Sequence, residues 1–312
     1  MNRDYGCDVC RVAHDAPMPL DVNGDHCCSC PSQTGARYST HFRVGLAVLA
    51  AARTAGLTAN REPPTASLLG NTYSAEQCRV LFPHGRRTNA DKAIFDAGQQ
   101  LQSFLDSTTD LTQRAIATAA LNELAAAAPP GGKGLRLDLQ LADDLASGIV
   151  AEKWIDFSIV HNTAASRRNK TLNALLAEQA ADPVAPAANG HLQPPAGTPA
   201  TTDAANLKGT KYDPLLFRGR SLFAAGKLPN KPDFVAAIAT HSGELGTDFA
   251  SLIEWVVRCY RTNTAPAHAN LLGSSKAKNV AAFRSATLDS VAAAIAGGWA
   301  QQLLSVGFPL SS

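Results

Sequence analysis

Two aspartates, Asp138 and Asp156, stand in stretches where apolar and polar residues alternate, L-R-L-D-L-Q-L (135–141) and W-I-D-F-S-I-V (154–160). Successive side chains of a β-strand point to opposite faces, so the alternation predicts two half-buried strands. If the strands pair as antiparallel neighbours, both carboxylates share a face. Two carboxylates with room between them for a divalent cation are the core of a metal-dependent phosphodiesterase. The alternative is a pair of ordinary amphipathic strands whose acids are solvated.

A second group of residues with metal-binding chemistry lies near the N-terminus, where five of the seven cysteines fall within the first 30 residues. Cys7 and Cys10 form a Cys-x2-Cys pair, which presents two thiolates from one turn. Zinc needs two further ligands to complete a tetrahedron, and His26 with Cys30 is the neatest second pair. The sequence therefore predicts a zinc knuckle.

The fourth zinc ligand stays open, because Cys27 or His41 would serve in place of His26. Four protein ligands leave no coordination position for a reactant, so we expect the knuckle to be structural. Free or redox-active thiols are the alternative interpretation of the same cysteines.

Composition sets outer limits on function. The 312 residues are enough to bury a sizeable core in one or two domains. A net charge of +2 gives no global argument for a polyanionic partner, so a nucleic-acid surface would be a local patch. Met1 precedes polar residues rather than a secretory signal, and clustered cysteines in an intracellular protein indicate metal rather than disulfides. Residues 290–310 lack charges, but their Gln and Gly residues favour a packed helix over a membrane span.

The elements that must position the two aspartates are mainly helical. Glu62 follows a first expected helix, either as a third acid on the metal side or as a surface glutamate. The other expected elements follow from periodicity, caps and Gly or Pro breaks. They are a helix from Ser39 or Thr40 to a stop at Gly56, helices over 89–104 and 111–128, a strand over 234–239, a helix over 249–260 and a pair of helices over 276–305.

Taken in chain order, these blocks resemble the C-terminal region of site-specific non-LTR retrotransposon polyproteins. In that family a zinc knuckle precedes a restriction-endonuclease-like domain of the PD-(D/E)XK superfamily. The resemblance covers nearly the whole chain through short blocks in a shared order. They are Cys7/Cys10, Gly24-Asp25-His26 with Cys30, His41-Phe42-Arg43, Ala55-Gly56-Leu57, Arg61-Glu62-Pro63, Leu135-Arg136-Leu137-Asp138, 156–162, Lys208-Gly209-Thr210-Lys211-Tyr212, 243–246 and 288–298.

The resemblance implies an α+β or α/β fold, with a nuclease-like core sheet flanked by helices. The zinc knuckle would span residues 1–41 and the restriction-endonuclease-like domain residues 42–312. A helical insertion over about 71–133 and a Pro/Ala-rich loop over about 182–206 would interrupt that domain.

The resemblance also implies a chemistry. Asp138 and Asp156 would bind one or two Mg²⁺ or Mn²⁺ ions, which activate water and neutralise the leaving oxygen. Ser158 stands where a lysine usually follows the second acid, and in the family a lysine of the Lys-x2-Lys-Tyr helix takes its role. That lysine is Lys208 or Lys211 here, with Lys208 ahead on family position. The implied function is nicking of target DNA by a nuclear protein, with RNA as a second candidate partner and no membrane partner.

The sequence departs from the family pattern at several points. The Pro-Ala preceding the first acid is missing, and Thr240 stands where the family has a glutamate. These departures favour an alternative, a catalytically degenerate zinc protein that keeps the nuclease fold and binds or assembles with nucleic acid. A third interpretation is that the chain is an alanine-rich helical subunit of a larger complex, in which the zinc knuckle only stabilises the structure. The oligomeric state stays open.

Overall fold

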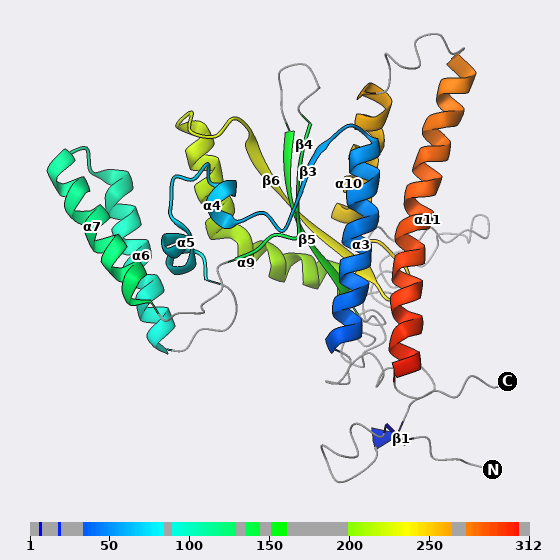
Figure 1. Ribbon diagram of the computed structural model, residues 1–312, viewed down its shortest axis with the longest axis horizontal. Helices are drawn as coiled ribbons and strands as arrows, with labels where there is room; N and C mark the ends of the chain where they lie inside the picture. The colour runs from blue at the N-terminus through cyan, green and yellow to red at the C-terminus, as the bar shows by residue number, and fades with distance from the viewer. Residues whose placement is uncertain are drawn as a thin grey trace, which may run out of the picture. The chain divides into compact units, whose positions relative to one another are not determined.

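The computed structural model describes residues 6–7, 18–19, 34–83, 89–128, 135–143, 151–160, 199–263 and 273–305. These residues form helices and a four-stranded sheet of strand order β3-β4-β5-β6 (Figure 1). The expected mixture of α and β structure is therefore confirmed. The strands are β1 (Gly6–Cys7), β2 (Met18–Pro19), β3 (Thr58–Arg61), β4 (Leu139–Ala142), β5 (Ala151–Val160) and β6 (Lys231–Thr240). The helices are α3 (Thr34–Thr54), α4 (Thr65–Leu68), α5 (Ala75–Leu81), α6 (Asn89–Ser107), α7 (Leu111–Ala127), α9 (Pro199–Ala224), α10 (Thr247–Asn263) and α11 (Gly273–Ser305).

The two alternating stretches form neighbouring strands. β4 pairs with β5 in antiparallel register, from Leu139 opposite Ile155 to Ala142 opposite Glu152. The condition under which the two carboxylates share a face, antiparallel pairing of the strands, is therefore met.

The first of these strands is shorter than predicted, because residues 135–137 make other hydrogen bonds. The Leu135 N–H donates to the Phe82 carbonyl at 2.6 Å, and the Tyr212 hydroxyl donates to the Arg136 carbonyl at 2.5 Å. These bonds join the segment to a loop and to a side chain instead of to a strand. The strand consequently begins at Leu139, one residue after Asp138.

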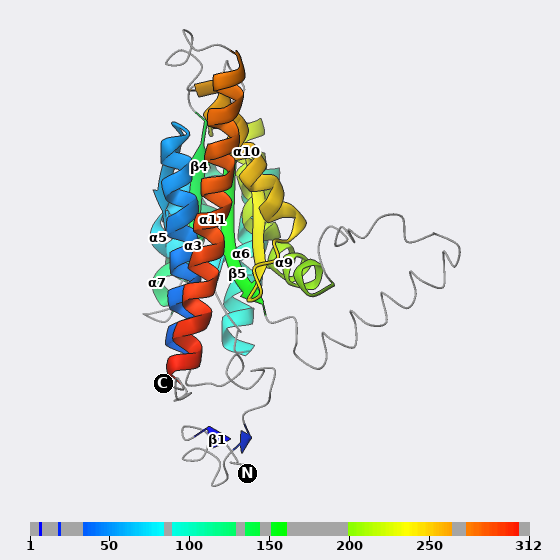
Figure 2. The ribbon, with the colours of Figure 1, turned by 90° about the vertical axis from the view of Figure 1, so that its right-hand side faces the viewer.

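The chain divides into two compact units, and unit 1 comprises Met1–Thr58, Asp156–Gly209 and Val235–Ser312. Within it α3 and α11 run side by side along most of their length (Figures 1 and 2). α3 begins at Thr34, several residues before the predicted start, and ends at the predicted stop, where Gly56 has a φ of 76°. A left-handed residue at this position is the usual end of a helix, because glycine adopts it without strain.

One continuous helix, α11, replaces the two helices predicted over 276–305. The Gly297-Gly298 pair lies inside it and faces α3. A Cβ atom on Gly298 would lie 1.9 Å from Thr40 Oγ1, and one on Gly297 would lie 3.2 Å from Arg43 Nη1. The two glycines therefore serve close helix packing rather than a break in the chain.

Unit 2 comprises Ala59–Ile155 and Thr210–Phe234. Its core is a cluster of buried side chains that includes Leu81, Leu121, Leu137, Trp154 and Tyr212. The predicted insertion helices correspond to α6 and α7, which pack on each other and on α5, and α6 extends a few residues beyond its predicted end.

Two elements around the sheet also differ from their predicted bounds. Residues 199–206, counted in the Pro/Ala-rich loop, are the first turns of α9, and proline is favoured at the first position of a helix. β6 and α10 are each longer than predicted, and α10 buries Leu252, Val256 and Cys259. Among the described helices, none is long and apolar enough to cross a membrane, and residues 290–305 belong to α11.

Cys78 and Cys259 are buried free thiols. Burial raises the pKa of Cys78 to about 12, so the thiol stays protonated and unreactive in the folded protein. At about pH 8, iodoacetamide will leave Cys78 unmodified in native protein and will alkylate it in urea, where its pKa returns to about 8.5. Peptide mass mapping measures this difference, and equal alkylation in both states would contradict the burial.

Candidate metal centre

Asp138 and Asp156 come together through the register of β4 and β5. Leu139 pairs with Ile155, so the residue before Leu139 lies beside the residue after Ile155. The Asp138 N–H also donates to the Ile155 carbonyl at 2.9 Å. Backbone pairing thus places the two acids that the sequence pattern singled out next to each other.

Asp156 is not the solvated acid of an ordinary amphipathic strand. Its residue surface is only 5% exposed, while Asp138 is half-buried. β5 is buried on both faces, because Trp154 on the face of Asp156 is as inaccessible as Ile155 and Phe157 on the other. A buried carboxylate is costly unless it is paired, so the partners of Asp156 matter.

Lys208, on α9, is one partner of Asp156. Its Nζ lies 2.5 Å from Asp156 Oδ2 and donates to the Phe157 carbonyl at 2.9 Å. Lys211, one turn later, has its Nζ 3.4 Å from the hydroxyl of Tyr212 and 4.8 Å from the centre of that ring. Of the two lysines that the resemblance proposed, Lys208 is therefore the one in an ion pair with the buried acid.

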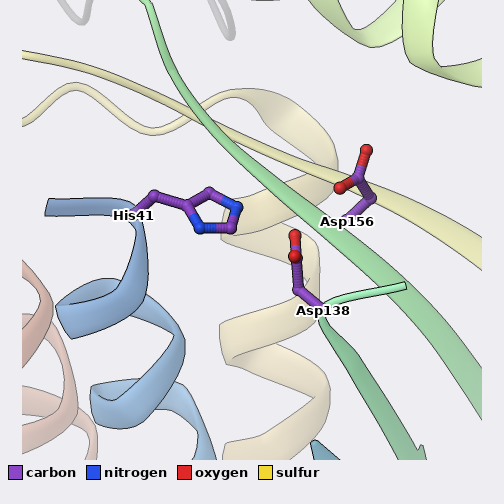
Figure 3. A group of neighbouring side chains, drawn as sticks. All are labelled: His41, Asp138 and Asp156. Atoms are coloured by element: carbon purple, nitrogen blue, oxygen red, sulfur yellow. The ribbon is translucent and has the colours of Figure 1, made fainter. Parts of the chain in front are cut away.

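His41 is the residue that sequence reasoning did not connect with the two acids. It reaches from α3 toward them (Figure 3), and one ligand atom from each of His41, Asp138 and Asp156 lies within 4.8 Å of the others. Its ring contacts the edge of the Phe157 ring at a centroid distance of 6.3 Å. The sequence offered His41 as an alternative zinc ligand and as part of a block of the resemblance, and its spacing contains no signal for a place beside β5.

The charges of this group favour a cation. Asp138 and Asp156 supply two carboxylates, and the Lys208 ammonium pairs with only one of them. Two carboxylate oxygens and one imidazole nitrogen are ligands that divalent metals use in proteins. The residues present therefore fit the divalent ion that the resemblance implies.

Glu62, the other candidate on the metal side, contributes through its backbone. Its N–H donates to the Asp138 carbonyl at 3.0 Å, while its side chain pairs with Arg61 at 3.0 Å and is 45% exposed. Glu62 has a φ of 45°, an uncommon value for a residue with a side chain. The exposed side chain thus fits the interpretation of Glu62 as a surface glutamate. The backbone hydrogen bond gives Glu62 a role in positioning Asp138.

Thr240, the position where the resemblance led us to look for a glutamate, stabilises a turn. Its hydroxyl accepts the Glu244 N–H at 3.0 Å and lies 2.9 Å from Ser242 Oγ. Since Thr240 carries no carboxylate, this position supplies no third acid.

The zinc knuckle remains a prediction. Cys7 belongs to β1, where it pairs with Met18 of β2. The other proposed ligands, Cys10, His26 and Cys30, and the alternative Cys27 lie outside the described residues.

No protein-family model, no curated protein and no solved structure matches the chain.

Proposed function

We propose that this chain is a metal-dependent endonuclease of the PD-(D/E)XK type. Asp138 and Asp156 would hold Mg²⁺ or Mn²⁺, and Lys208 would act on the scissile phosphate. The observation that supports the proposal most is the ion pair between Lys208 and the buried Asp156, beside a second acid that directly precedes the neighbouring strand. An ordinary amphipathic strand pair has no need of such a buried pair.

Each residue of the centre has a separate role in this proposal. When bound, a divalent ion lowers the pKa of a coordinated water and offsets phosphate charge. The ladder between β4 and β5 sets the separation of the two carboxylates. Asp156 and the Phe157 carbonyl hold the Lys208 ammonium, so that its remaining N–H can donate to an oxygen of the phosphate as negative charge develops there.

DNA is the proposed substrate on the strength of the resemblance, with RNA as the second candidate. The net charge of +2 requires the phosphate contacts to come from a local surface. The predicted zinc knuckle would help to position the nucleic acid, and the proposed location is the nucleus.

Substitution of the two lysines tests the proposal. Lys208→Met will slow plasmid nicking in Mg²⁺ or Mn²⁺ by about 100-fold or more, the usual effect of removing a group that stabilises transition-state charge. Lys211→Met will slow it less than about 10-fold, because Lys211 contacts the Tyr212 ring while Lys208 forms the ion pair with Asp156. Conversion of supercoiled to open-circular DNA measures both rates, with EDTA as the blank.

Thermal unfolding of both variants shows whether the fold is kept. Equal losses of nicking activity in the two variants would contradict the role proposed for Lys208 at the scissile phosphate. A wild-type protein that binds DNA but never nicks it in either metal would replace the enzyme by the non-cleaving nucleic-acid-binding protein.

A further inference from the structure

The imidazole of His41 is a ligand that an oxygen-only magnesium site does not need. Mg²⁺ binds oxygen ligands and retains several waters, whereas imidazole suits first-row transition ions. His41 lies with Asp138 and Asp156 in a group whose ligand atoms are all within 4.8 Å of one another (Figure 3).

The place of His41 is set by rigid packing within unit 1. The preceding residue, Thr40, is 3% exposed and fits against Gly298 of α11, where a side chain would clash. The His41 ring meets Phe157 edge-on at an interplanar angle of 82°, and Phe157 is itself buried next to Asp156. A helix fixed at Thr40 therefore holds the imidazole close to β5 before any ion binds.

We infer that His41 is the third protein ligand of the centre, and that the centre takes Mn²⁺ in preference to Mg²⁺. The inference rests on the proposed function, because it uses the same two carboxylates, and it adds the identity of the metal. Two carboxylates with one imidazole retain enough oxygen ligands for Mn²⁺ and add the nitrogen ligand that Mg²⁺ rarely uses. The same assignment removes His41 from the alternatives for the zinc knuckle.

Metal binding tests the inference without any need for activity. The full-length protein is titrated with Mn²⁺ while the EPR signal of free aqueous Mn²⁺ is followed, and Mg²⁺ is added as a competitor. Wild-type protein will bind Mn²⁺ at least about 10-fold more tightly than Mg²⁺. His41→Gln, which keeps a side chain of similar length, will weaken Mn²⁺ binding by about 10- to 100-fold and change Mg²⁺ binding by less than about 3-fold.

Pulsed EPR supplies a direct signature of the ligand. The Mn²⁺-loaded wild type will show modulation from a coordinated imidazole nitrogen, and His41→Gln will lack it. His241→Ala is the matched control, since His241 is a histidine of the same unit whose ring contacts Trp299 at 5.0 Å and which is outside the His41 group. It will keep both the affinity and the nitrogen signal.

Equal affinities of the wild type for the two metals, or unchanged Mn²⁺ affinity and nitrogen signal in His41→Gln, would overturn the inference. The outcome is separable from that of the nicking assay. A protein that binds Mn²⁺ through His41 but does not nick DNA retains this inference and loses the proposed function. If the wild type nicks DNA and His41→Gln binds Mn²⁺ normally, the proposed function is retained and this inference is lost.

Discussion

Asp156→Asn will abolish metal-dependent nicking, with an expected loss of about 100-fold or more. Asparagine keeps the shape of the side chain but removes the charge that holds both the proposed ion and Lys208. The free energy of unfolding will also fall, by about 1–3 kcal/mol, because the substitution leaves the Lys208 ammonium, whose side chain is only 21% exposed, without its carboxylate. Plasmid nicking and urea unfolding measure the two effects.

The double variant Asp156→Asn/Lys208→Met separates chemistry from folding. Removal of both charges relieves the unpaired ammonium, so stability will recover toward the wild-type value while activity stays lost. Retained nicking in Asp156→Asn would show that the carboxylate does not belong to the active centre. An unchanged free energy of unfolding would show that the ion pair contributes nothing to the fold.

Gly298→Ala will lower the free energy of unfolding by about 1–3 kcal/mol, the usual cost of overpacking a close contact. In an exposed helix the same change stabilises a protein by about 0.5–1 kcal/mol. The sign reverses here because the added Cβ would lie 1.9 Å from Thr40 Oγ1 and 2.5 Å from Thr40 Cβ. Relief of the clash must displace α3 or α11, and a displacement of α3 carries His41 with it. Mn²⁺ affinity will therefore decrease together with stability.

Gly209→Ala is the matched control, because a Cβ on this glycine of α9 meets nothing within 4 Å. It will stabilise the protein by about 0.5–1 kcal/mol. Thr40→Gly in the Gly298→Ala background removes the atoms in the clash and will restore part of the loss. A stabilising effect of Gly298→Ala alone would contradict the close packing of α3 on α11.

Much of the local structure was predictable because it depends on periodicity and on local breaks. The alternation around Asp138 and Asp156 predicted two strands, and it implied that the two acids share a face if those strands pair as antiparallel neighbours. The predicted helices over 89–104 and 111–128 correspond to α6 and α7, and the stop at Gly56 is confirmed. In each case the signal lies within a few residues of the element that it predicts.

The errors in the predicted elements arise where distant residues intervene. Residues 135–137 alternate as a strand does, but they bond to Phe82 and Tyr212 instead of a neighbouring strand. Two helices were predicted over 276–305, yet α11 is continuous and its Gly297-Gly298 pair accommodates Thr40 of α3. A local pattern contains no information about which surface a residue will meet.

In the candidate centre too, the sequence predicted some of the residues and only the tertiary structure revealed the others. Sequence alone singled out Asp138 and Asp156, because alternation along two strands already implies which face each acid occupies. The tertiary structure alone shows that Lys208 pairs with Asp156, since the spacing of Lys208 and Lys211 in the sequence does not indicate which of them reaches β5. It also brought His41 to the acids from a helix about a hundred residues earlier in the chain. Contacts between elements this far apart depend on how α3, α9 and the sheet pack together, and no periodicity within one element specifies that packing.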